Sequence, residues 1–142
     1  LHTAYRRQRQ MCIRDRPFID MIAETAKAAG ATGARRVGVL ATPGAALLYA
    51  EALAAEGLEM VAPSPAERER FMQVVFGVKA GDVGPDQRAA MRDLAQALIA
   101  AGAEAVIGGC TEVPLLLDQG DVEAPLIDSA EVLARACVAA CR

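Results

Sequence analysis

Short apolar stretches alternate with longer amphipathic segments along most of the chain. The short stretches are typical of buried strands, and the longer segments have the spacing of helices. The expected strands cover residues 35–41, 58–62, 104–108 and 124–127. The expected helices cover residues 22–29, 45–56, 64–77, 85–101 and 115–119, with a last one after residue 128. Residues 17–20 have the composition of the end of a further strand.

This order of elements predicts the fold class. Strands that alternate with helices pair in parallel through right-handed crossovers. We therefore expect a three-layer α/β domain with a small parallel sheet of about four strands flanked by helices. Ligands of such sheets bind beyond the carboxyl ends of the strands. Two loops with unusual chemistry leave those ends, at residues 42–44 (Thr-Pro-Gly) and 109–112 (Gly-Cys-Thr-Glu).

Composition narrows the class of protein. The chain has 142 residues, of which 54% are hydrophobic and 23% charged, enough apolar material for one core. No apolar stretch is long enough for a membrane helix, and no secretory signal is visible, so we expect a cytoplasmic protein that does not engage membranes. The net charge of −3 argues against a generic nucleic-acid binder. Without a CxxC pair or clustered histidines, we expect no metal site.

The first sixteen residues differ from the rest. They hold five of the fifteen basic residues and one acidic residue, without a helical or strand period. Such a segment can be a basic arm that touches nucleic acid or lipid head groups. We interpret residues 1–16 as a foreign or disordered head, such as an artefact of the sequence, and exclude it, with His2 and Cys12, from the fold.

Cys110 is the first candidate for chemistry. It follows a predicted buried strand and precedes a predicted short helix, so backbone N–H groups should converge on its sulfur. This placement favours the thiolate and predicts a lowered pKa for Cys110. A thiolate there could act as a nucleophile or as a proton-transfer base. The alternative is a small buried residue at the end of a strand.

The neighbours of Cys110 extend the candidate site. Thr111 and Glu112 could bind a cationic group such as a substrate ammonium, although Glu112 could also merely complement a helix dipole. The charge of Glu112 opposes thiolate formation unless a cation is bound. Thr42 could donate to a substrate carboxylate or cap a helix. Lys79 could balance a substrate carboxylate or be a solvated surface charge.

Cys137 and Cys141 lie four residues apart on the last predicted helix. This spacing is compatible with a thiol pair or with half of a metal site. We expect instead two small apolar residues on one buried helix face.

Four stretches resemble a known family. They are VGVLATPG at 37–44, LYAEALAAEGLEMVAPS at 48–64, GGCTEVPLLL at 108–117 and APLIDSAEVLARACV at 124–138. Together they resemble the C-terminal half of aspartate/glutamate racemases, over about residues 17–142. The resemblance implies that residues 35–142 form one of the two similar domains of the racemase fold, preceded by an interdomain segment and helix at 17–34.

The resemblance also assigns roles. Cys110 matches the second catalytic cysteine, and Thr111 and Glu112 match the residues beside it that contact the substrate. Thr42 matches a threonine that helps to bind the substrate carboxylate. Lys79 falls where many members have a lysine. The implied reaction is cofactor-independent racemisation of a small amino acid, in which two cysteines, one from each domain, face each other across the α-carbon.

The sequence departs from the family in two ways. The domain that supplies the first cysteine is missing, and the surroundings of Cys12 do not match that cysteine. Leu133 stands where many members have a histidine. We therefore expect a fragment that is inactive or nearly so alone, with the missing N-terminal domain or a second copy of the chain as its partner.

Two alternatives remain at this stage. A related cysteine-dependent decarboxylase, hydantoin racemase or maleate isomerase would use the same thiol, although Glu112 favours an amino-acid substrate. An inactive module that binds a small anion or a partner protein is the other. An exposed apolar patch is expected in either case, where the missing domain once packed.

Overall fold

The computed structural model describes residues 17–142, so the expectations for residues 1–16 lie outside the described residues. Four strands form one parallel sheet in the order β2-β1-β3-β4. The strands are β1 (Arg36–Leu40), β2 (Glu59–Val61), β3 (Ala105–Gly108) and β4 (Leu126–Asp128). The helices are α2 (Met21–Ala31), α3 (Pro43–Ala55), α4 (Pro65–Lys79), α5 (Pro85–Ala100) and α6 (Ser129–Ala140). Two 3₁₀ turns, η1 (Val113–Leu115) and η2 (Gln119–Asp121), join β3 to β4.

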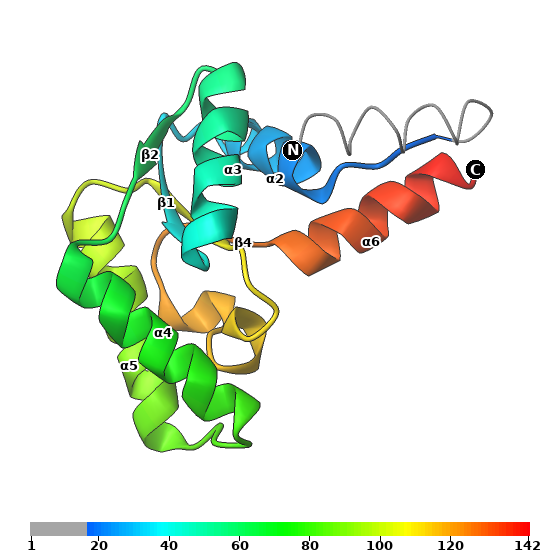
Figure 1. The fold of residues 1–142 in the computed structure, drawn as a ribbon. Helices are drawn as coiled ribbons and strands as arrows, with labels where there is room; N and C mark the ends of the chain where they lie inside the picture. Colours follow the sequence, from blue (N-terminus) through cyan, green and yellow to red (C-terminus); the bar gives the residue numbers. More distant parts are fainter. Residues whose placement is uncertain (1–16) are drawn as a thin grey trace.

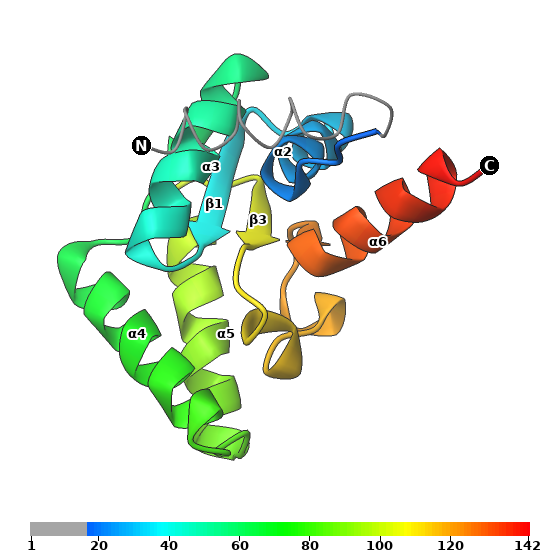
Figure 2. The same cartoon turned by 45° about the vertical axis from the view of Figure 1, so that its right-hand side comes forward.

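Two apolar clusters pack on the two faces of the sheet (Figures 1 and 2). One joins Leu40 and Val106 to the buried faces of α4 and α5. The other joins Val39 and Ile107 to α2 and α3. Because side chains alternate between the faces of a strand, neighbouring residues of β1 and β3 supply both clusters. The three-layer α/β architecture and the four-stranded parallel sheet are therefore confirmed.

The strand order places a crevice between β1 and β3. From β1 the chain crosses to β2 on one side, and it later returns to β3 on the other side of β1. Such a reversal is the point at which open α/β sheets bind ligands. Leu40 and Gly108, the last residues of the two strands, lie opposite each other. Thr42 and Cys110 each follow two residues later, so the two loops leave the sheet side by side.

Three local expectations are wrong. Residues 17–20 form no strand, because the Asp20 carboxylate accepts hydrogen bonds from the first N–H groups of α2 and caps that helix. The short helix expected at 115–119 is replaced by η1 and η2. At η2 the Asp121 carboxylate accepts a hydrogen bond from the Asp118 N–H, and the Asp121 N–H donates to the Asp118 carbonyl. The loop expected to begin at Lys79 begins one residue later, because Lys79 still belongs to α4.

The expectation for the last helix is also wrong. Cys137 and Cys141 are exposed, not buried. Only the first part of α6 packs against the domain, with Ser129 buried and Val132 against the α2–α3 side of the core. Beyond that, α6 projects away from the sheet (Figure 1), and most of its residues are exposed. Within residues 17–142, no helix is long and apolar enough to cross a membrane.

Candidate active site

Cys110 lies on the loop that leaves β3, and the backbone holds this loop against β1. The Gly109 N–H donates to the Leu40 carbonyl over 2.9 Å, and the Val113 N–H donates to the Cys110 carbonyl over 3.1 Å. The Cys110 side chain is half-buried and packs against the core beneath α4 and α5. The thiol is thereby fixed at the crevice between β1 and β3.

Tyr49 of α3 restricts which residue the loop can have at position 109. A Cβ atom on Gly109 would lie 2.6 Å from Cε2 of Tyr49 and 3.1 Å from Cβ of Ala41, so only glycine fits there without a shift. Tyr49 is fully buried, and within residues 17–142 its hydroxyl makes no hydrogen bond. Nearby, the Ser129 hydroxyl donates to the Gly108 carbonyl over 3.0 Å. The sequence gives no signal for this role of Tyr49, because helical spacing does not reveal which residue contacts a glycine sixty positions away.

Glu112 joins three of the candidate side chains. The Cys110 thiol donates to Oε2 of Glu112 over 2.6 Å, and the Thr111 hydroxyl donates to the same oxygen over 3.2 Å. Nζ of Lys79 lies 3.9 Å from the other carboxylate oxygen. The Glu112 side chain is only 13% exposed, whereas that of Lys79 is 59% exposed. The fold therefore brings together Cys110, Thr111, Glu112 and Lys79, four of the five residues singled out in the sequence.

The electrostatics keep the resting thiol protonated. Burial, followed by the hydrogen bond to the Glu112 carboxylate, raises the pKa of Cys110 above its ordinary value. The expected lowering of this pKa is therefore wrong: a backbone N–H of Glu112 and the charge of Lys79 oppose the rise but do not reverse it. In turn, the hydrogen bond from Cys110 lowers the pKa of Glu112.

Thr42 occupies the N-cap position of α3 but does not cap it with its side chain. Its hydroxyl makes no hydrogen bond to the first turn of the helix, which begins with Pro43. Thr42 is half-buried at the end of β1, beside the loop of Cys110. The hydroxyl is therefore free of the capping role that was its alternative assignment.

Replacing Glu112 by glutamine should make Cys110 more reactive. The change removes the negative charge that disfavours the thiolate, so the pKa of Cys110 should fall and the thiolate fraction at pH 7 should rise. We expect iodoacetamide to alkylate Cys110 roughly 3- to 10-fold faster at pH 7, with the difference fading as the pH rises above the pKa of Cys110. Mass spectrometry of the Cys110 peptide measures this rate.

Glu51→Gln is the matched control, because Glu51 is an exposed carboxylate on α3, away from the thiol. Its rate should equal that of the unmodified chain. An unchanged or slower Cys110 rate in folded Glu112→Gln protein would contradict this account of the thiol.

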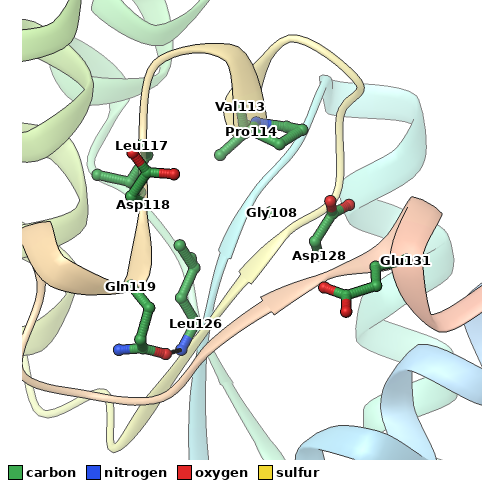
Figure 3. Close-up of a pocket in the computed structure, with 9 residues that line it drawn as sticks. All are labelled: Gly108, Val113, Pro114, Leu117, Asp118, Gln119, Leu126, Asp128 and Glu131. Carbon is green, nitrogen blue, oxygen red and sulfur yellow. Dashed lines mark hydrogen bonds between the residues drawn. The ribbon is translucent and has the colours of Figure 1, made fainter.

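A small polar pocket lies on the β4 side of the Cys110 loop (Figure 3). It has a volume of about 170 Å³, and Cys110 does not line it. Its walls carry the carboxylates of Asp118, Asp128 and Glu131, and Gln119 accepts a hydrogen bond from the Leu126 N–H across its floor. These carboxylates disfavour the binding of an anion in this pocket. No cluster suited to a metal ion occurs within residues 17–142.

Sequence comparison identifies a family and a relative of the chain. The model of the Asp/Glu/hydantoin racemase family matches residues 1–137. An uncharacterised protein from the region 3′ of pnlA in Pectobacterium carotovorum subsp. carotovorum is 30% identical over 125 residues, which cover 85% of this chain and 81% of that protein.

Structural comparison finds the same fold in larger chains. A Yersinia pestis protein assigned to the Asp/Glu racemases superposes with a TM-score of 0.81 at 26% identity, over 89% of this chain and 57% of that one. An aspartate racemase homologue from Pyrococcus horikoshii OT3 gives 0.76 at 30% identity, over 87% and 55%. Aspartate racemase of Picrophilus torridus gives 0.67 at 26% identity, over 86% and 52%. The chain thus spans just over half the length of these structures.

Proposed function

Because the chain belongs to the Asp/Glu/hydantoin racemase family, we propose that it moves a proton at the α-carbon of an amino acid, with Cys110 as the transferring group. The observation that carries this proposal is the connected row Cys110–Glu112–Lys79 at the crevice between β1 and β3. The row combines a thiol, a carboxylate and an ammonium group at the edge of the sheet where ligands bind.

The charges of this row complement a zwitterion. An amino acid carries an ammonium that can pair with Glu112 and a carboxylate that can approach Lys79 and the Thr42 hydroxyl. In the resting site, Glu112 and Lys79 lie opposite each other at 3.9 Å, so each substrate charge replaces a partner already present. The α-carbon would then lie against the thiol, because Glu112 is hydrogen-bonded to Cys110.

Substrate binding also prepares the thiol for catalysis. The substrate ammonium offsets the Glu112 charge that holds the proton on Cys110, so the pKa of the thiol falls and its proton passes to water. The thiolate then takes the α-hydrogen and becomes a thiol again, while the electron pair of the broken C–H bond spreads into the carboxylate. Thr42 donates a hydrogen bond to that carboxylate, where the charge accumulates.

Inversion needs a second proton donor on the opposite face of the substrate. Among the described residues, Cys110 is the one thiol at the crevice, because Cys137 on α6 and Cys141 just after that helix are exposed. We assign the second donor to a part of the protein outside residues 17–142, or to a second copy of the chain. Cofactor independence is part of this proposal, because the thiol and the hydroxyl supply the acid, the base and the hydrogen bond.

Substrate protection of Cys110 tests the proposal. A bound amino acid should cover the thiol and slow its alkylation, while the exposed Cys137 and Cys141 keep their rates and serve as internal controls. Two matched pairs isolate the ammonium: L-aspartate against succinate, and L-leucine against 4-methylpentanoate. We expect protection by at least one of the two amino acids and none by its ammonium-free partner.

Equal protection by the ammonium-free acids would contradict the amino-acid assignment and favour an isomerase or decarboxylase that acts on other acids. If no ligand slows the alkylation of Cys110, the crevice does not bind an amino acid and the proposal fails.

A further inference from the structure

An apolar cavity of about 250 Å³ lies beyond the ends of β1 and β2. The first turns of α3 close one side, through Ala46 and Leu47, and the first half of α4 closes the other, through Phe71 and Met72. Figure 2 shows these two helices on either side of the sheet edge. Among the described residues, Arg68 is the one charged residue that lines the cavity, and it is exposed.

The cavity adjoins the proposed substrate site. Ala41 and Pro43 both line it, and Thr42 lies between them in the chain. A substrate whose carboxylate is held at Thr42 therefore begins at the mouth of this cavity. The polar pocket of Figure 3 lies on the opposite side of the Cys110 loop and does not share these residues.

Helix α4 connects the cavity with Cys110. Arg68, Met72, Phe76 and Lys79 follow one another at intervals of four, four and three residues, so they share one face of α4. Lys79 follows Met72 by seven positions in the helix, a distance of about 10 Å along the axis. Lys79 at the end of this row meets Glu112, and Glu112 meets Cys110.

The apolar lining of the cavity indicates which kind of substrate side chain it can hold. We propose that it receives the side chain of the substrate, and that this substrate is an amino acid with a large apolar side chain, not a dicarboxylic one. The inference rests on the proposed function, because it takes Thr42 and Cys110 as the places where the α-carboxylate and the α-carbon are held.

Size and polarity support this choice. An apolar cavity of about 150 Å³ is large enough to bind benzene, so this one can hold an isobutyl or a phenyl group. The second carboxylate of aspartate or glutamate would enter apolar walls and lose its water, which is costly for a charged group. Arg68 stands at the exposed rim, where water screens its charge.

Methionine methyl groups report on the cavity directly. Met60 and Met72 line it, whereas Met91 is fully buried in the core and Met21 lies on α2. In a chain labelled with ¹³C-methyl methionine, L-leucine and L-phenylalanine should shift the Met60 and Met72 signals and leave the Met91 signal in place. We expect a Kd at least about tenfold lower for L-leucine than for L-aspartate.

Two variants sharpen the test. Ala46→Leu fills the cavity and should weaken L-leucine binding at least about tenfold, while the unchanged Met91 signal reports that the core is intact. Ala54→Leu, on the exposed side of the same helix, is the matched control and should bind as the original chain does.

Other outcomes separate this inference from the proposed function. If L-aspartate or L-glutamate protects Cys110 from alkylation while L-leucine does neither, the proposed function stands and the apolar cavity does not hold the side chain. Preference for L-glutamate that disappears in Arg68→Gln would assign the cavity to a dicarboxylic substrate and overturn the inference. If no amino acid protects Cys110 or moves the methyl signals, the proposed function and the inference both fail.

Discussion

Replacing Cys110 by alanine is expected to reduce α-hydrogen exchange by about 10²- to 10⁴-fold, the range over which a positioned general base or acid contributes. The thiol is hydrogen-bonded to Glu112 and held at the crevice between β1 and β3 by its loop. Among the described residues, no other thiol reaches this place. Exchange is measured as loss of the α-hydrogen NMR signal of the amino acid in D₂O.

Cys110→Ser and Cys137→Ala complete this comparison. A serine hydroxyl keeps the shape of the thiol but is a far weaker acid, so Cys110→Ser should lose nearly as much activity as Cys110→Ala. Cys137 is exposed on α6, so Cys137→Ala should exchange at the original rate. Equal rates in the original chain and in Cys110→Ala would show that another group moves the proton.

The chain alone is expected to exchange the α-hydrogen without racemising the amino acid. A single thiol removes the proton from one face and returns a deuteron to that same face, so the configuration is kept. Racemisation needs a donor on the opposite face, and the chain spans just over half of the structures that it resembles. Chiral chromatography of the amino acid after incubation in D₂O measures the two enantiomers.

Concentration separates the two sources of a second donor. If two copies of the chain pair across the crevice, racemisation should rise with the square of the chain concentration while the monomer predominates, and in proportion to it once sedimentation shows mainly dimer. If the donor lies in a preceding domain, racemisation should appear only when such a domain is present. Racemisation that is first order in a chain shown to be monomeric would contradict the requirement for a second half.

The fold could be predicted from sequence because the local patterns along the chain all indicate the same alternation of strands and helices. The apolar stretch of β1 and the glycines after α3 and α5 mark the alternation of strand and helix directly. Expectations failed where a distant element decides the outcome. The spacing of Cys137 and Cys141 predicts one helix face, but only the neighbours of α6 determine whether that face is covered.

The candidate site was predictable in its members but not in its electrostatics. The loop sequence and the resemblance identified Cys110, Thr111 and Glu112, and the fold brings Lys79 to them. The direction of the shift in the pKa of Cys110 depends on the burial of the thiol and on its hydrogen bond to the Glu112 carboxylate. The spacing of residues in the sequence predicts neither of them. The apolar cavity also escaped prediction, because α3 and α4 form it together.

The central claim is that the Cys110 thiol of this chain moves the α-proton of an amino acid. The most direct test incubates the chain, Cys110→Ala and Cys137→Ala with L-aspartate, L-glutamate, L-leucine and L-phenylalanine in D₂O, in parallel samples. The account predicts deuterium at the α-carbon in the original chain and in Cys137→Ala, and little or none in Cys110→Ala. Absence of exchange in the folded original chain, or exchange that survives in Cys110→Ala, would contradict it.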